Sequence, residues 1–261
     1  MSRIAIDSDR CLRDGACVDV CPARYLAVGN DNLPVEVDGR NCILCGHCVA
    51  VCPNDAFTHH ELPAADFLPV VTDWPAPAIM DGLLNSRRSV REFVQQPVDH
   101  ATMEALLDVA RRAPTASNSQ KLHWIVVSGP EKVQEIARAI IDCGRVAGLH
   151  PSLLAQWDAG CDFVLRNAPT LAIVCAPEEY RWGKEDGAIA LAFLELAAEA
   201  RDLGVCWAGY LTRVASENAS LRALLGVPEG FTVRGGLMLG EGTHVYTRIP
   251  PRKPLSAHWI E

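Results

Sequence analysis

The chain has 261 residues, of which 49% are hydrophobic and 21% are charged, and its net charge at pH 7 is −8. This composition predicts a soluble globule made of one large domain, or of a small domain joined to a medium one. Residues 1–60 carry eight acidic side chains against five arginines and no lysine, and the remainder is also acidic, so no nucleic-acid partner is expected.

Cysteine is the residue type that departs from this ordinary composition, because seven of the eleven cysteines lie between residues 11 and 52. The first residues, Met-Ser-Arg-Ile-Ala-Ile-Asp, contain no apolar segment of the signal-peptide kind. A reducing cytoplasm is therefore expected instead of a disulfide-rich secreted protein. The longest apolar stretch, residues 188–200, contains Glu195 and Glu199 and is too short to cross a bilayer, so we expect no membrane span.

The first predicted elements are two short strands, residues 4–6 and 35–37, and each leads into a run of cysteines. The second run, residues 42–53, has the spacing C-x2-C-x2-C-x3-C-P, in which the fourth cysteine serves a second iron–sulfur cluster. The first run lies 31 residues upstream and matches it, except that Asp14 stands in the place of Cys45. This internal repeat predicts a two-cluster module with approximate two-fold symmetry. A zinc ribbon is the disfavoured alternative, since its usual cue is two separated C-x2-C pairs.

Residues 1 to about 60 closely resemble the bacterial two-cluster ferredoxins. The resemblance implies that three ligands of one run share a cluster with the last cysteine of the other run. The implied [4Fe-4S] ligand set is Cys21, Cys42, Cys45 and Cys48, and the second set is Cys11, Asp14, Cys17 and Cys52. A carboxylate is a harder and weaker iron ligand than a thiolate. Three alternatives follow: Asp14 ligates a [4Fe-4S] cluster, the site holds [3Fe-4S], or water fills the position.

Residues 62–78 contain four prolines and show neither helical nor alternating periodicity. We interpret them as a semi-extended linker that lies against the second domain, because several of its residues are too apolar for a free tether. His59 and His60 precede it and are interpreted as a polar exit from the module. The expected organisation is a two-cluster module over residues 1–61, a linker over 62–78 and a second domain over 79–261.

The second domain alternates helical and strand patterns, which predicts an α+β layer around a central sheet. Asp99 is expected to cap the first helix and Pro114 to stop it. The elements that follow are a buried strand 122–127, a helix from Pro130, a buried strand 171–176, an apolar core helix 187–203, a strand 205–210, a short helix 217–225 and a strand 231–239.

Three arginines stand close together just after the linker, at positions 87, 88 and 91, with serines at 86 and 89. A guanidinium group suits phosphate recognition because its planar fork donates two hydrogen bonds at once. Taken alone, such a cluster is more often a solvated face. Neither G-x-G-x-x-G nor G-x-x-x-x-G-K-[ST] occurs in residues 78–261, so a Rossmann dinucleotide-binding domain and a P-loop are not expected.

Four motifs in this order resemble the nitroreductase family of FMN-dependent enzymes over about residues 79–257. They are Arg87-Arg88-Ser-Val-Arg91-Glu-Phe, Ala113-Pro114-Thr-Ala-Ser-Asn118-Ser-Gln120, Gly204-Val-Cys-Trp207-Ala208-Gly209 and Pro251-Arg252-Lys253-Pro254-Leu255. The resemblance implies a nitroreductase-type α/β sandwich with a central, mostly antiparallel sheet. It also implies a homodimer with FMN in the subunit interface.

The resemblance implies four groups of FMN contacts. The FMN phosphate and ribityl chain would meet Arg87, Arg88 and Ser89, helped by Arg252 and Lys253, and the anionic N1/O2 edge of the reduced ring would meet Arg91. The ring would be lined from the partner subunit by Pro114, Thr115, Ala116 and Asn118, and its N5 edge would meet backbone groups of Ala208 and Gly209. Lys121 replaces the family's usual proline and is expected to face water. Four cysteines outside the module are expected to be buried, and Cys206 alone to lie within reach of the flavin.

These patterns together predict an iron–sulfur flavoprotein oxidoreductase. It would relay electrons between the clusters and FMN to reduce a nitroaromatic, quinone or enone, with flavin N5 carrying the hydride and no separate catalytic residue. Electrons would come from a donor protein or from NAD(P)H, and the loops 143–157 and 180–184 would select the substrate. One alternative is an electron carrier or redox sensor without turnover, and another is an NAD(P)H-driven enzyme that exports electrons through the clusters.

Overall fold

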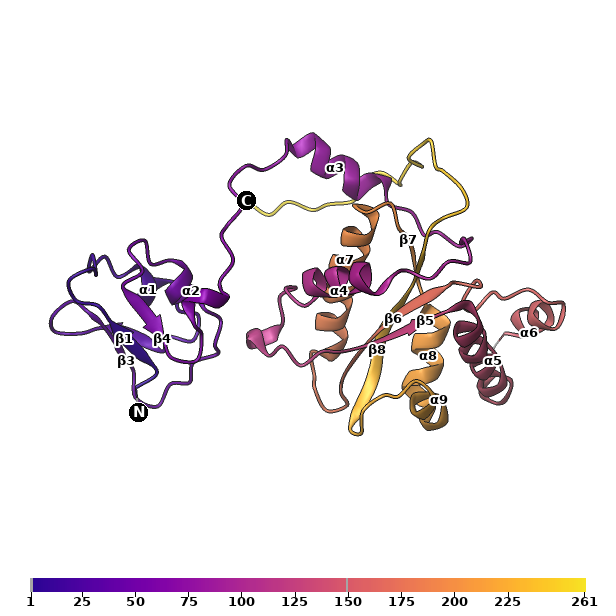
Figure 1. Ribbon diagram of the computed structural model, residues 1–261, viewed down its shortest axis with the longest axis horizontal. Coiled ribbons are helices and arrows are strands. Elements are labelled where there is room, and N and C mark those ends of the chain that lie inside the picture. The colour runs from indigo at the N-terminus through magenta and orange to yellow at the C-terminus, as the bar shows by residue number, and fades with distance from the viewer. Residues whose placement is uncertain (1, 149) are drawn as a thin grey trace. The chain divides into compact units, whose positions relative to one another are not determined.

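The computed structural model describes residues 2–148 and 150–261. The chain divides into two compact units (Figure 1). The first unit extends to Trp74 and also contains Ser117–Ser119, and the second comprises Pro75–Ala116 and Gln120–Glu261. Within the described residues, no helix combines the length and the hydropathy that crossing a bilayer requires.

The first unit is built from two antiparallel strand pairs around short helices. Strand β1 (Ile4–Ile6) pairs with β4 (Phe57–His59), and β2 (Leu26–Val28) pairs with β3 (Pro34–Glu36). The helices α1 (Ala16–Asp19) and α2 (His47–Ala50) follow at equivalent places of the two cysteine runs, and a 3-10 turn, η1 (Ala64–Asp66), lies beyond β4. This arrangement confirms the ferredoxin-like repeat that the sequence predicts.

The repeat extends to backbone conformation. Arg13 and Leu44 have φ angles of 54° and 52°, and Gly15 and Gly46 have φ angles of 75° and 74°. The left-handed region is unfavourable for residues other than glycine. Since both runs adopt it at the same positions, the fold of each cysteine run requires this turn.

The second unit is a four-stranded, antiparallel sheet covered by helices on both faces, which confirms the predicted fold class. Its strand order is β5 (His123–Ser128), β6 (Thr170–Pro177), β8 (Phe231–Gly240) and β7 (Gly204–Trp207). Alternate residues of β6 belong to different apolar clusters, with Leu171 and Ile173 on one face and Ala172 and Val174 on the other. Strand β6 therefore contributes side chains to both layers of the core.

One face of this sheet packs against α4 (His100–Ala110) and α7 (Gly183–Glu199). The opposite face packs against α5 (Pro130–Ala147), α8 (Gly209–Glu217) and α9 (Ala219–Leu224) (Figure 1). As predicted, Asp99 caps α4, and its side chain accepts a hydrogen bond from the backbone N–H of Thr102 at 2.9 Å.

Three sequence predictions were wrong about where an element begins or ends, and in two of them a proline that opens a helix was not recognised. Pro77 opens α3 (Pro77–Ser86) inside the predicted linker, and Pro151 opens α6 (Pro151–Asp158) inside the predicted loop 143–157. Proline is well tolerated at the first helical position, where its missing N–H costs nothing. The predicted strand 205–210 ends at Trp207, because helix α8 starts at Gly209.

Burial also differs from the prediction in two elements. Only Val127 of β5 is buried, because β5 is an edge strand that pairs on one side only. In α7 one face is fully buried, whereas Ile189 and Phe193 on the other remain 39% and 38% exposed. Helix α7 is therefore amphipathic. The prediction of a core helix that is buried on most sides was wrong.

Candidate functional site

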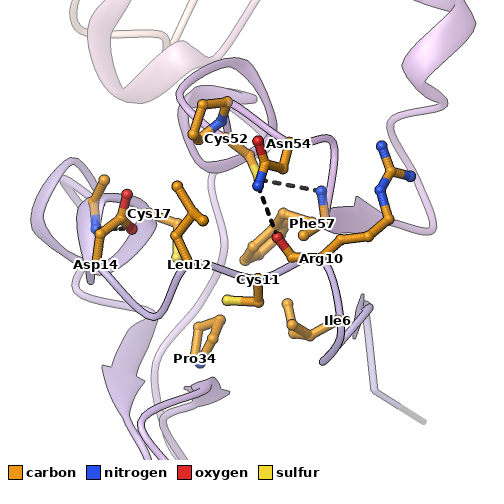
Figure 2. Close-up of a pocket in the computed structure, with 13 residues that line it drawn as sticks. Ile6, Arg10, Cys11, Leu12, Asp14, Cys17, Pro34, Cys52, Asn54 and Phe57 are labelled. Atoms are coloured by element: carbon orange, nitrogen blue, oxygen red, sulfur yellow. Dashed lines mark hydrogen bonds between the residues drawn. The ribbon is translucent and has the colours of Figure 1, made fainter.

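The first candidate metal site is a cavity in which both cysteine runs meet (Figure 2). Its lining includes Cys11, Asp14 and Cys17 from the first run and Cys52 from the second. Ile6, Leu12, Pro34 and Phe57 supply apolar walls. The structure thus brings together all four residues of the irregular ligand set.

The second candidate metal site is a separate cavity, which is lined by the other predicted set of four ligands. Cys42, Cys45 and Cys48 of the second run line it together with Cys21 of the first. Four convergent thiols inside apolar walls fit an iron–sulfur cluster, whose potential depends on exclusion of water. Among the described residues, no three His, Cys, Asp or Glu side chains gather tightly enough to hold one metal ion.

Backbone N–H groups donate to four cysteine sulfurs in a symmetrical pattern. The N–H groups of Arg13 and Leu44 donate to Cys11 Sγ and Cys42 Sγ, each at 3.4 Å. The N–H groups of Tyr25 and Ala56 donate to Cys21 Sγ at 3.3 Å and to Cys52 Sγ at 3.2 Å. Such bonds stabilise negative charge on cluster sulfurs. The left-handed turns at Arg13 and Leu44 therefore serve to aim donors at the ligands.

Asp14 occupies the position at which the first run lacks a cysteine. Its Oδ1 accepts a hydrogen bond from the backbone N–H of Ala16 at 3.1 Å, at the start of α1. This bond holds the carboxylate at the cavity that Asp14 lines. Ligation of iron by Asp14 stays a prediction.

His59 lies against the regular ligand set and was missed as a functional residue. It is 2% exposed, and its Nε2 lies 3.6 Å from Cys42 Sγ. Burial lowers the pKa of His59 below its ordinary value. A signal was present in the sequence, because alternate strand residues face the same side and the apolar Phe57 stands two residues before His59.

The arginine motif of the second unit lies along strand β7. Val90 N–H donates to the carbonyl of Val205 at 2.9 Å, and Ser89 forms a parallel bridge with Val205. This approach requires a glycine opposite Val90, since a Cβ on Gly204 would meet three Val90 side-chain atoms at 2.8 Å. Two motifs that are more than a hundred residues apart in the sequence are thereby joined.

Substituting Gly204→Ala is expected to lower the free energy of unfolding by about 2 kcal/mol, because the new methyl group overpacks against Val90. Urea denaturation measures this loss. Adding Val90→Ala to the same chain should recover part of it, whereas purely additive losses would contradict the contact. Gly82→Ala in α3 is a matched control, since no atom lies within 4 Å of its new Cβ.

A cavity of about 410 Å³ lies beside β7 and the start of α8. Three guanidinium groups line it, those of Arg91, Arg166 and Arg213, together with Phe163, Trp207 and Tyr210. No acidic side chain among the described residues lines it. The Arg166 guanidinium lies 4.2 Å from the centroid of the Phe163 ring, a cation–π contact. The size, the aromatic walls and the positive edge fit a flavin ring whose reduced form is anionic.

Of the predicted N5-edge residues, Gly209 lines this cavity and is the first residue of α8, where backbone N–H groups lack helical partners. Ala208 is buried beside it as the N-terminal cap, and its own N–H donates to the carbonyl of Gly236 at 2.8 Å. Cys206 also lines the cavity. Burial raises the pKa of the Cys206 thiol, with Arg91 and Arg166 acting in the opposite direction.

The predicted phosphate-binding residues are partly engaged by their own chain. Arg87 Nη1 donates to Glu195 Oε1 at 3.0 Å, and Glu195 Oε2 accepts from Trp207 Nε1 at 3.4 Å. Arg88 donates to the carbonyls of Arg87 and Asn85, whereas its Nε is buried without a hydrogen-bond partner. That unpaired donor fits an anionic ligand such as a phosphate.

Comparison with known proteins decides the family. A model of the nitroreductase family matches residues 84–241, and a 4Fe-4S dicluster domain matches residues 3–53. The chain belongs to the nitroreductase family. Both halves of the resemblance seen in the sequence are thereby confirmed.

One curated protein and two solved structures illustrate what this chain is similar to. The 5,6-dimethylbenzimidazole synthase of Rhodospirillum rubrum is 30% identical over 180 residues, which are 62% of this chain and 81% of that protein. The crystal structure of a nitroreductase with bound FMN from Bacteroides fragilis is 25% identical, covers 69% of this chain and 96% of its own, and has a TM-score of 0.56. A nitroreductase from Desulfitobacterium hafniense shares the fold at 22% identity, with coverages of 69% and 97% and a TM-score of 0.58.

Within this nitroreductase unit, a buried carboxylate holds the loop that is expected to line the ring. Asp186 accepts from Ala116 N–H at 3.0 Å through Oδ1 and from the Tyr180 hydroxyl at 2.6 Å through Oδ2. Pro114 and Thr115 precede this anchor. Asn118 follows it with a φ of 53° and belongs to the first unit. Sequence reasoning missed Asp186, because an acidic residue in the first turn of a helix is ordinarily explained by the helix dipole and predicts no buried partner.

The remaining residues singled out in the sequence of this unit lie outside the cavity. Arg252 and Lys253 lie in an exposed C-terminal segment without regular structure and do not line the cavity. Lys121 is exposed as expected, with its ammonium 5.2 Å from the centroid of the Tyr180 ring. Of the four cysteines outside the module, Cys161 is exposed and Cys143 only half-buried, so the expectation of burial was wrong for both. Cys143 lies in the C-terminal half of α5, and Cys161 follows α6.

Proposed function

We propose that this protein relays electrons between its two iron–sulfur clusters and an FMN, and that a small organic substrate of the nitroaromatic, quinone or enone type is reduced at the flavin. The observation that carries the proposal is one chain with two crossed ligand sets in its first unit and a cationic, aromatic cavity in its second. At the coarser level, family membership and the FMN-bound neighbours support an FMN-dependent oxidoreductase.

Bound FMN supplies hydride and single-electron transfer. We propose that Arg91 stabilises negative charge at the N1/O2 edge of the ring, with Arg166 and Arg213 contributing to the same positive field. The N–H of Gly209 is proposed to donate toward the N5 edge, and Trp207 and Tyr210 to exclude water from the cavity that they line. Asp186 is proposed to hold the ring-lining loop through the N–H of Ala116.

We propose residues 1–61 as the cluster-binding module and residues 79–261 as the FMN-binding domain, joined by residues 62–78. The matched ranges, 3–53 and 84–241, lie inside these limits. We propose a cytoplasmic location, because cysteines that serve as cluster ligands must stay free of disulfides, as they do in a reducing compartment.

Anaerobic stopped-flow mixing tests the direction of electron flow. Bleaching of the flavin by reduced ferredoxin, followed by turnover of one of the three substrate classes, is the expected result. Bleaching by NAD(P)H alone would favour the alternative enzyme that exports electrons through its clusters. If a preparation fully loaded with FMN and iron turns over none of the three classes, the electron carrier or redox sensor is favoured instead.

We also propose that the protein forms a homodimer through the outer face of α7, with FMN at the interface. The exposed apolar side chains of Ile189 and Phe193 on this helix support the proposal. An aspartate introduced on this face should prevent dimer formation, because association would bury its unpaired carboxylate.

Substituting Phe193→Asp is therefore expected to convert the dimer to a monomer and to release FMN, as measured by light scattering coupled to size-exclusion chromatography and by flavin absorbance. Leu224→Asp is the matched control, since Leu224 on α9 is 39% exposed and Phe193 is 38% exposed. A monomeric parent protein, or equal dissociation by both variants, would contradict the proposed interface.

A further inference from the structure

The imidazole of His59 has a defined donor and a defined acceptor. Its Nδ1 accepts a hydrogen bond from the backbone N–H of Glu61 at 3.2 Å. A neutral imidazole carries its proton on one nitrogen, so accepting at Nδ1 assigns the proton to Nε2. The 3.6 Å contact of Nε2 with Cys42 Sγ is then an N–H donor aimed at sulfur.

This donor breaks the two-fold symmetry of the module. The position that corresponds to His59 in the first repeat, 31 residues earlier, is Val28, which is apolar and 53% exposed. The corresponding sulfurs of Cys11 and Cys42 each accept one backbone N–H at 3.4 Å. Among the residues that the structure describes, the imidazole is therefore an additional donor at Cys42 without a counterpart at Cys11.

We propose that His59 is a positioning residue that raises the reduction potential of the cluster held by Cys21, Cys42, Cys45 and Cys48, by donating a hydrogen bond from Nε2 to Cys42 Sγ. Reduction adds one electron to the cluster and moves no proton from His59. The added negative charge is shared with the sulfur ligands, so a donor at Cys42 stabilises the reduced form more than the oxidised form. The inference rests on the proposed ligand set but needs neither flavin nor substrate turnover.

The consequence is an unequal pair of clusters. At a given ambient potential, the hydrogen bond increases the reduced fraction of the cluster at Cys42 and leaves the cluster at Cys11 unchanged. His59 would therefore shift shared electrons toward the Cys42 side of the module. The backbone donors alone predict no such preference, because both cysteine runs provide the same N–H donors.

Redox titration of the full holoprotein, followed by EPR, tests this inference. With His59→Leu, the reduced-to-oxidised ratio of the Cys42 cluster at fixed potential should fall roughly tenfold, the effect of one hydrogen bond to a charged acceptor. A tenfold change corresponds to a downward shift of about 59 mV for a one-electron couple. The Cys11 cluster should keep its midpoint and serves as an internal control.

Two further variants separate the hydrogen bond from packing. In His59→Gln the side-chain amide nitrogen can replace Nε2, so the midpoint should remain close to that of the parent. In His59→Asn the shorter amide does not reach Cys42 Sγ, so the midpoint should fall as in His59→Leu. This pair carries the test if His59→Leu does not assemble, and His60→Leu controls for loss of a neighbouring exposed histidine.

An unchanged midpoint in His59→Leu or His59→Asn, or an equal fall in His59→Gln and His59→Asn, would overturn the inference. Failure of the proposed function has a different signature, namely absent flavin reduction or absent turnover with normal cluster potentials. Failure of the ligand assignment is also distinct, because the parent protein would then lack the EPR signals of two clusters before any variant is compared.

Discussion

Replacing Cys45 by alanine is expected to remove one iron–sulfur cluster and to leave the other in place. Cys45 lines the cavity that also contains Cys21, Cys42 and Cys48. Replacing Cys52 should damage the other cluster, although Cys52 and Cys45 stand in the same run, because Cys52 lines the cavity of Cys11. Each variant should retain about half of the parent's iron, since each ligand set holds one cluster.

Iron content per chain and EPR of the reduced protein measure this result. The surviving EPR signal should differ between Cys45→Ala and Cys52→Ala. Loss of the same signal in both variants would show that each run holds its own cluster, and the crossed assignment would be wrong. Cys161→Ala is the control, since this cysteine is exposed and lies outside the module, and it should keep all of the iron.

Replacing Arg87 by alanine is expected to lower the free energy of unfolding by about 3 kcal/mol, because it strands the Glu195 carboxylate without its ionic partner. The side chains of Arg87 and Glu195 are 25% and 10% exposed, and their N–O distance is 3.0 Å. The loss is placed at the lower end of the range for buried pairs because Arg87 keeps some contact with water. Urea denaturation followed by tryptophan fluorescence measures it.

Two controls define the role of Arg87. Arg111→Ala removes an exposed ion pair, in which the side chains of Arg111 and Asp108 are 63% and 49% exposed. This variant should lower the free energy of unfolding by at most about 0.5 kcal/mol. The double variant Arg87→Ala, Glu195→Ala should recover part of the stability lost in the single variant. If Arg87→Ala weakens FMN binding and leaves stability unchanged, the phosphate contact implied by the family resemblance dominates and the structural role is contradicted.

The cluster module was predictable because its chemistry is local and repeated. The spacing of each cysteine run sets the ligand positions, and in the sequence alone the offset of 31 residues pairs Asp14 with Cys45. The same offset could not reveal His59 as a donor, since the repeat relates it to Val28. The contact of His59 with Cys42 exists because tertiary packing buries this side of β4 against the cysteines.

The cavity in the second unit was predictable only in part. Arg91 and Gly209 belong to motifs, whereas Arg166 and Arg213 belong to none, and only the tertiary fold brings them to the same cavity. Glu195 was noted only as a charge within an apolar helix. A buried carboxylate needs a partner. That this partner is Arg87, more than a hundred residues away in the sequence, follows only from the packing of α7.

Leu62 and Phe67 change the meaning of the segment between the two units. Leu62 lines the cavity of Cys42, and a Cβ on Gly46 would lie 3.1 Å from ring carbons of Phe67. The expectation that the linker lies against the second domain was wrong for these residues, which pack on the first. Cutting the chain after residue 61 would remove part of the wall that keeps water from a metal cluster. A shortened ferredoxin made from this protein should therefore end beyond Phe67, because the connecting segment is also a component of the redox centre.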